Sequence, residues 1–164
     1  MTAPVTLLVN GEPRTVEAPP FATLADTLRE VLHLTGTKVG CEAGDCGACT
    51  VLLDGEQVCA CLVPTAQADG RAVTTIEGSD PAGLIDRLRE AFLARGAAQC
   101  GICTPAMILA AADGLRRDPR PDRAAVEDAI GGVLCRCTGY VAIVDAVMDV
   151  ARGANAPEIG RAHV

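Results

Sequence analysis

The sequence predicts an α+β protein in which a half rich in strands precedes an all-helical half. Two observations support this prediction. Up to about residue 77, short apolar runs alternate with turn signals, whereas beyond residue 81 the apolar residues recur with the helical period. In addition, eight of the nine cysteines form two groups of four, one in each half. We expect a strand-rich domain over 1–79, a helical domain over 80–154 and a C-terminal tail over 155–164.

The strand-rich half is expected to begin with a β-hairpin. Val5–Val9 is apolar and partly β-branched, and Asn10-Gly11 is a strong signal for a two-residue turn. The returning strand is expected at about Arg14–Glu17. After the break at Pro19-Pro20, Thr23 is a candidate N-cap for a helix. That helix is predicted from apolar residues at the 3.6-residue period, which are Leu24, Leu28, Val31 and Leu32.

A second hairpin and a last strand complete the predicted sheet. Thr50–Leu53 is followed by the turn Asp54-Gly55 and a returning strand over Gln57–Leu62, and Ala72–Ile76 resembles a short strand. We expect a mixed sheet packed on one helix. Alternation along the returning strand places Cys59 and Cys61 on the same face, so both are within reach of one site.

Four helices are predicted in the helical half. Asp80 is a candidate N-cap with Pro81 at the first helical position, ahead of an apolar face over Leu84–Phe92. The other three predicted helices run from Thr104 to about Leu115, from Asp122 to about Val133 and from Val141 to Arg152.

The two cysteine groups have different spacings. The first tetrad follows C-x4-C-x2-C-x11-C and comprises Cys41, Cys46, Cys49 and Cys61. The second tetrad follows C-x2-C-x31-C-x-C and comprises Cys100, Cys103, Cys135 and Cys137. Four thiolates hold either an iron–sulfur cluster or a structural zinc ion. A disulfide framework is the weaker alternative, because no secretory signal is visible and free thiols indicate a reducing, cytoplasmic compartment.

The residues around the tetrads favour iron–sulfur over zinc. The loop 40–49 has three glycines, which allow backbone N–H groups to approach anionic sulfurs, and its C-x4-C-x2-C order is that of plant-type [2Fe–2S] ligation. The second tetrad lies at predicted helix starts, where helix dipoles favour an anionic group. Its C-x-C pair is also unusual for structural zinc. Cys59 is interpreted as a small buried residue.

Charge and hydropathy exclude two other classes of function. The net charge of −7 leaves no basic stripe for nucleic acid. No apolar run of about 18 residues is present, so we expect no membrane span.

At the cysteines the chain resembles the iron–sulfur subunit of the xanthine dehydrogenase and aldehyde oxidase family, the molybdenum hydroxylases. The resemblance extends from about Val5 to Arg152. The matching stretches are Leu34–Cys41, Asp45–Val51, Gln99–Pro105 and Leu134–Tyr140. It implies a ferredoxin-like (β-grasp) domain and a four-helix bundle domain, each with one [2Fe–2S] cluster. It also selects Cys61 over Cys59 as the fourth ligand of the first tetrad, because the family's ligand precedes a leucine.

The same resemblance implies an electron-transfer subunit with no turnover of its own. Electrons would pass from a molybdenum cofactor on a large subunit through both clusters to FAD, usually on a medium subunit. Gln99 and the backbone around Cys137 are implied contacts of the molybdopterin. The alternatives are a free-standing two-cluster ferredoxin-like carrier and a zinc-stabilised interaction module. The tail over Glu158–Val164 resembles the segment that opens many large subunits, and a disordered end is the alternative.

Overall fold

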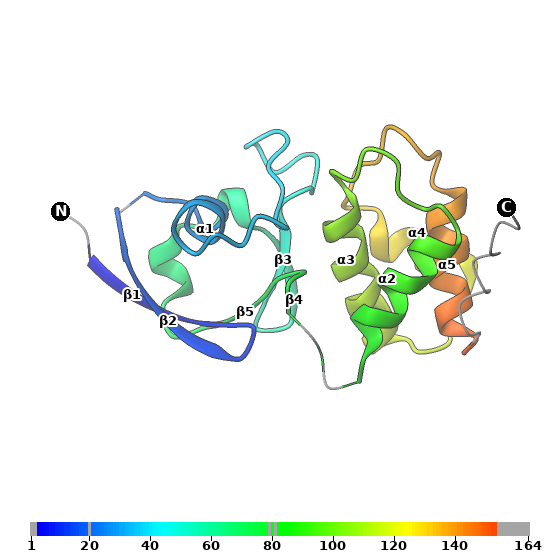
Figure 1. Ribbon diagram of the computed structural model, residues 1–164, viewed down its shortest axis with the longest axis horizontal. Helices are drawn as coiled ribbons and strands as arrows, with labels where there is room; N and C mark the ends of the chain where they lie inside the picture. Colours follow the sequence, from blue (N-terminus) through cyan, green and yellow to red (C-terminus); the bar gives the residue numbers. More distant parts are fainter. Residues whose placement is uncertain (1–2, 20, 79, 81, 154–164) are drawn as a thin grey trace, which may run out of the picture.

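The computed structural model describes residues 3–19, 21–78, 80 and 82–153. The chain forms an α+β protein in which a ferredoxin-like half is followed by a helical half. Figure 1 shows the strands at the left and α2–α5 at the right. The predicted tail over 155–164, together with Pro20 and Pro81, lies outside the described residues.

A mixed five-stranded sheet forms the first half, with the strand order β2-β1-β5-β3-β4. Its strands are β1 (Ala3–Val9), β2 (Glu12–Ala18), β3 (Thr50–Leu53), β4 (Glu56–Cys59) and β5 (Ala72–Thr74). Both predicted hairpins are confirmed: β1 pairs antiparallel with β2, and β3 with β4. β5 pairs parallel with β1, which makes the sheet mixed.

One helical segment covers this sheet, but it is less regular than the sequence suggested. Thr23 caps it as predicted, because its Oγ1 accepts the backbone N–H of Asp26 at 3.1 Å. The segment is divided into a short α1 (Leu24–Asp26) and the π-helical η1 (Thr27–Val31). Wider π-type turns shift the periodicity, and Val31, which was expected on the buried face, is 51% exposed.

The second hairpin ends earlier than predicted, and this changes the setting of Cys61. β4 stops at Cys59, and Cys61 lies on the 3-10 turn η2 (Ala60–Leu62). A second 3-10 turn, η3 (Thr65–Ala68), follows. The expectation that Cys59 and Cys61 share one face of a strand was therefore wrong, since the chain no longer has strand geometry at Cys61.

In the described part of the second half, the chain forms the four predicted helices. They are α2 (Leu84–Ala94), α3 (Thr104–Arg117), α4 (Arg123–Ile130) and α5 (Val141–Ala151). Their apolar faces form a core separate from that of the sheet, extending from Leu84 to Val150. None of these described helices is long and apolar enough to cross a membrane.

The start of α2 differs from the prediction. The helix begins at Leu84, with Gly83 as its N-cap at a φ of 62°. Asp80 still caps the start of the helix, although it lies four residues before it, because its carboxylate accepts the backbone N–H groups of Leu84 at 3.2 Å and Ile85 at 2.8 Å. Arg116 of α3 lies 3.7 Å from the same carboxylate.

We expect the Asp80→Asn variant to be less stable by about 1 kcal/mol at neutral pH. Burial raises the pKa of Asp80, but N–H donors from Ile85, Leu84 and Ala82 and the charge of Arg116 together bring it below the usual 3.8. A lowered folded pKa means that this stability is present above the unfolded pKa and is lost as pH falls through the folded pKa. The difference between wild type and variant should therefore shrink in acid, as measured by denaturation at several pH values.

The control for this prediction is Asp86→Asn on the same helix. Asp86 is exposed and pairs with Arg89 one turn away, so the variant should cost less than about 0.5 kcal/mol. An equal loss of unfolding free energy in both variants would show that the hydrogen bonds to Asp80 add no stability beyond that of an exposed carboxylate.

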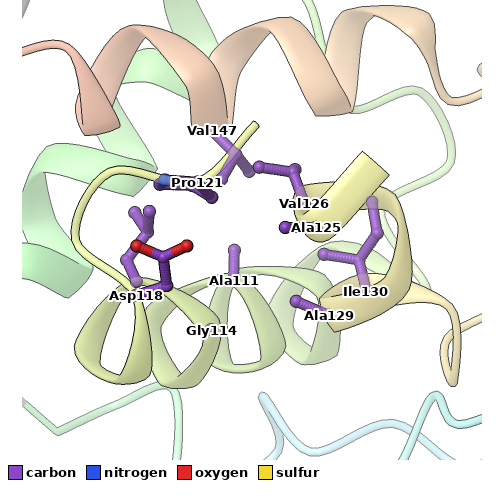
Figure 2. Close-up of a pocket in the computed structure, with 10 residues that line it drawn as sticks. Ala111, Gly114, Asp118, Pro121, Ala125, Val126, Ala129, Ile130 and Val147 are labelled. Carbon is purple, nitrogen blue, oxygen red and sulfur yellow. The ribbon is translucent and has the colours of Figure 1, made fainter. Parts of the chain in front are cut away.

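Close packing of α3 on α4 depends on Gly114. Figure 2 shows Gly114 and Ala129 facing each other beside a small apolar cavity of about 30 Å³. A Cβ added to Gly114 would lie 2.6 Å from the Cβ of Ala129, well inside contact distance. The two helices can approach this closely only because residue 114 has no side chain.

We therefore expect Gly114→Ala to destabilise the helical half by about 1–2 kcal/mol, since overpacking outweighs the gain in helix propensity. Adding Ala129→Gly removes the clashing methyl group and should recover most of the loss. The measurement is the denaturant midpoint of both variants. A Gly114→Ala variant as stable as wild type would contradict the tight contact between Gly114 and Ala129.

Candidate metal centres

The first tetrad is assembled from one loop and one turn. The loop between η1 and β3 carries three of the cysteines, and η2 supplies Cys61. Cys41 neighbours Cys46, and Cys49 neighbours both Cys61 and Cys59. Cys49 and Cys61 are buried, whereas the other pair is half-buried. The tetrad therefore has a buried side and a side toward the surface.

Backbone donors surround the outer pair. Cys41 Sγ accepts the N–H groups of Cys46 and Ala43, each at 3.4 Å, and these donors lower the pKa of Cys41 to about 7. Burial acts in the opposite direction on Cys49, whose pKa rises to about 12. A buried thiol of this kind must release its proton when a metal binds, so loading of the site is coupled to proton release.

Glycine brings the backbone close to the sulfurs. A Cβ added to Gly40 would lie 3.0 Å from Cys46 Sγ, and one added to Gly44 would lie 2.4 Å from Leu62 Cδ1. Gly44 also has a φ of 78°, a conformation that favours glycine. This tight loop, rich in N–H donors, fits an anionic cluster whose sulfurs accept hydrogen bonds.

Cys59 lies beside the first tetrad. Its Sγ donates to the carbonyl oxygen of Gly44 at 3.6 Å, and burial raises its pKa. It ends β4, where it pairs with Thr50. The Cys59 thiol therefore has a backbone hydrogen-bond partner, Gly44, in the loop between η1 and β3.

The second tetrad joins two helix starts. Cys103 is the N-cap of α3 and is buried, and Cys135 is half-buried in the loop before α5. Cys100 neighbours Cys137, and Cys103 neighbours Cys135. Cys100 and Cys137 are exposed. One edge of this tetrad therefore reaches the protein surface.

An unpartnered hydroxyl marks the second tetrad. Among the buried side-chain nitrogen and oxygen atoms of the described residues, Thr104 Oγ1 alone has no hydrogen-bond partner. Thr104 follows Cys103 directly at the first turn of α3. Buried hydroxyls are nearly always satisfied, so an acceptor is expected beside this one. A sulfur of a bound cluster would supply it, and the residues present fit such a group.

Four free thiols are the common feature of both tetrads. In the described ranges, no three His, Cys, Asp or Glu side chains form a group that would hold a single metal ion. A [2Fe–2S] cluster is bound by four cysteines and contains two irons. Each tetrad supplies the four thiols that such a cluster needs.

The two tetrads meet through the backbone. The N–H of Leu134 donates to the carbonyl oxygen of Cys46 at 2.9 Å. A Cβ on Gly47 would lie 2.0 Å from the carbonyl oxygen of Gly132, so the loops are in direct contact. In Figure 1 the loops that carry the cysteines lie together along the upper edge of the molecule.

Polar side-chain contacts also join α3 to β4. Asp113 of α3 is 4% exposed and accepts from Gln57 of β4 at 2.7 Å. Arg117 links Asp113, at 3.1 Å, to Glu56, at 2.7 Å. These contacts link α3 to β4, the first part-buried and the last exposed at the surface.

Gln99 lies on the exposed edge of the second tetrad. Gln99, Cys100 and Cys137 are all exposed, together with Ile102 and Leu134. Thr138 is the residue that the sequence reasoning missed: its Oγ1 lies 3.1 Å from Cys135 Sγ. A hydroxyl residue close to a candidate cysteine ligand was the signal that would have found it.

Comparison with known sequences matches each half to a family. Residues 7–75 match the "2Fe-2S iron-sulfur cluster binding domain". Residues 75–148 match the "[2Fe-2S] binding domain".

Whole-chain relatives are similar over most of the length. The nicotine 6-hydroxylase small subunit of Paenarthrobacter nicotinovorans is 48% identical over 86% of this chain and 85% of that protein. The xanthine dehydrogenase iron-sulfur-binding subunit of Escherichia coli O157:H7 is 39% identical over 90% of this chain and 94% of that protein.

Solved structures show the same fold. The quinoline 2-oxidoreductase of Pseudomonas putida aligns with a TM-score of 0.86 and 41% identity over 94% of this chain and 98% of that chain. The aldehyde oxidoreductase of Desulfovibrio desulfuricans aligns with a TM-score of 0.85 and 46% identity over 92% of this chain but 17% of that chain.

Proposed function

Because the chain belongs to the small iron–sulfur subunits of the xanthine dehydrogenase and aldehyde oxidase family of molybdenum hydroxylases, we propose that its two tetrads each bind one [2Fe–2S] cluster and act in series. The chain is an electron-transfer subunit of an oxidoreductase complex. The contact between Leu134 and Cys46 carries this proposal, since it joins the two cysteine loops directly.

The proposed ligands are the eight cysteines of the two tetrads. Cys41, Cys46, Cys49 and Cys61 would together hold the first cluster. Cys100, Cys103, Cys135 and Cys137 would hold the second. Cys59 is not a proposed ligand.

Each cluster accepts and releases a single electron when it is bound. The protein contributes the thiolates, the N–H donors around Cys41 and the fixed spacing of the two loops. A carbonyl of one ligand, Cys46, accepts from the residue that precedes another ligand, Cys135, so a short bonded route connects the two sites. Polar contacts at Asp113 also link α3 to β4.

The separate cores support a division into a β-grasp domain over 1–79 and a four-helix bundle domain over 80–154. We assign the exposed edge of the second tetrad, with Gln99 and the backbone around Cys137, to a molybdopterin held by a large subunit. The first tetrad would then face the acceptor side, with FAD on a medium subunit. The cysteine-rich composition supports a reducing, cytoplasmic setting.

Anaerobic affinity purification of the tagged chain from its native cells tests this assignment. We expect larger chains to copurify, with about one molybdenum for every four irons. Recovery of the chain alone, with its iron but without molybdenum, would favour a free-standing two-cluster carrier instead.

A further inference from the structure

The hydroxyl of Thr138 has a fixed direction. Thr138 Oγ1 accepts the backbone N–H of Tyr140 at 3.2 Å and lies 3.1 Å from Cys135 Sγ. Because the amide of Tyr140 already occupies an acceptor site of the oxygen, the hydroxyl proton is available to the sulfur. A metal-bound Cys135 is a thiolate, which can only accept. The hydrogen bond therefore runs from Thr138 to Cys135.

The backbone N–H groups of Thr138 and Cys137 also act on the Cys135 sulfur, whereas the amide of Cys135 itself does not. The N–H of Cys135 donates to the hydroxyl oxygen of Tyr140 at 2.8 Å, so it is directed away from the sulfurs. Tyr140 has a φ of 67° and is the N-cap of α5, a backbone turn that brings its side chain back toward the loop. Thr138 and Tyr140 thus hold Cys135 at its sulfur and at its amide.

We propose that Thr138 is a positioning residue that raises the reduction potential of the cluster at the second tetrad, by donating a hydrogen bond to Cys135 Sγ. This inference rests on the proposed function, in which Cys135 is a ligand. Reduction adds one negative charge to the cluster and its thiolates. A donor to a thiolate stabilises the reduced form more than the oxidised form, so it shifts the potential in the positive direction.

The test compares Thr138→Val with Thr138→Ser in the full chain or its complex. Valine has nearly the shape of threonine but cannot donate, whereas serine retains the hydroxyl. EPR-monitored redox titration should show a more negative midpoint for the second cluster in Thr138→Val and a wild-type midpoint in Thr138→Ser. The cluster at the first tetrad is an internal control, because its midpoint should not move in either variant.

Three results would overturn the proposal. An unchanged midpoint in a fully loaded Thr138→Val variant would show that the hydroxyl has no influence. Equal shifts in the valine and serine variants would assign the effect to packing. If Thr138→Val fails to load, Thr138→Ala replaces it, and a wild-type midpoint there would have the same meaning.

The proposed function fails in a different way. Wild-type chain with cluster signal from the first tetrad alone would refute the ligand role of Cys135, and with it the role of Thr138. Two wild-type signals with no shift on substitution would refute only the role of Thr138.

Discussion

The Cys103→Ala variant is expected to lose one of two [2Fe–2S] clusters and to keep the other. Cys103 is buried at the start of α3, and Cys135 packs partly buried against the same core. The iron content should fall from about four atoms per chain to about two. The strand-rich half has its own core, so its cluster and its EPR signal should remain.

The corresponding variant in the first tetrad is Cys49→Ala, which should lose the EPR signal of the first cluster and keep that of the second. Cys59→Ala is the matched control: it removes a neighbouring thiol from the same hairpin and should retain both clusters. A loss of the first cluster in Cys59→Ala, together with its retention in Cys61→Ala, would move the fourth ligand from Cys61 to Cys59. Loss of both clusters in every variant would contradict the independence of the two sites.

Gly47→Ala is expected to have the second-largest effect, because it acts where the two cysteine loops touch. Gly47 has a φ of 66°, and its added Cβ would lie 2.0 Å from the carbonyl oxygen of Gly132 and 3.0 Å from the Cα of Val133. Both close neighbours are backbone atoms, so no side-chain rotation can relieve the clash. The loops must separate.

Two costs should add in this variant. The left-handed backbone costs about 1–2 kcal/mol for alanine, and forced separation of the loops costs about 1–3 kcal/mol more. Spin–spin coupling between the two reduced clusters should weaken, because the contact between Leu134 and Cys46 sets their spacing. The measurements are the denaturant midpoint and the EPR line shape of the fully reduced chain.

Gly55→Ala is the control for Gly47→Ala. Gly55 has a φ of 86°, but nothing lies within 4 Å of its added Cβ. This variant carries the backbone cost without the clash, so its EPR line shape should match wild type. Identical behaviour of the two variants would mean that the loops are not held in contact.

Local signals in the sequence predicted much of the fold. Asn10-Gly11 and Asp54-Gly55 both adopt the positive φ angles that a tight hairpin requires, and both hairpins were located correctly. The predicted cap at Thr23 is also present, and Asp122, predicted as the first residue of a helix, is the N-cap of α4. These features depend only on neighbouring residues, so a sequence pattern is sufficient to find them.

Features set by tertiary packing were not predicted as well. α2 begins at Leu84 rather than next to Asp80, because Gly83 supplies a left-handed N-cap and Asp80 reaches the helix through its carboxylate. β4 ends at Cys59, so the face of Cys61 could not be inferred from alternation. In both cases the chain turns where the expected pattern would have continued.

For the candidate sites, too, local features could be predicted from the sequence and tertiary contacts could not. The spacing of the cysteines along the chain is enough to predict two tetrads as candidate ligand sets. Two contacts join residues from different elements: Leu134 with Cys46, and Asp113 with Gln57. The unpartnered state of the Thr104 hydroxyl depends on its burial. Only a folded structure contains that information.

The most direct test of the account is the iron and acid-labile sulfide content of the anaerobically purified chain, measured with low-temperature EPR after dithionite reduction. The account predicts about four irons and four sulfides per chain, with two distinguishable S = 1/2 signals. A colourless, zinc-containing chain would contradict electron transfer altogether. Two irons with a single signal would contradict a cluster in one of the two tetrads.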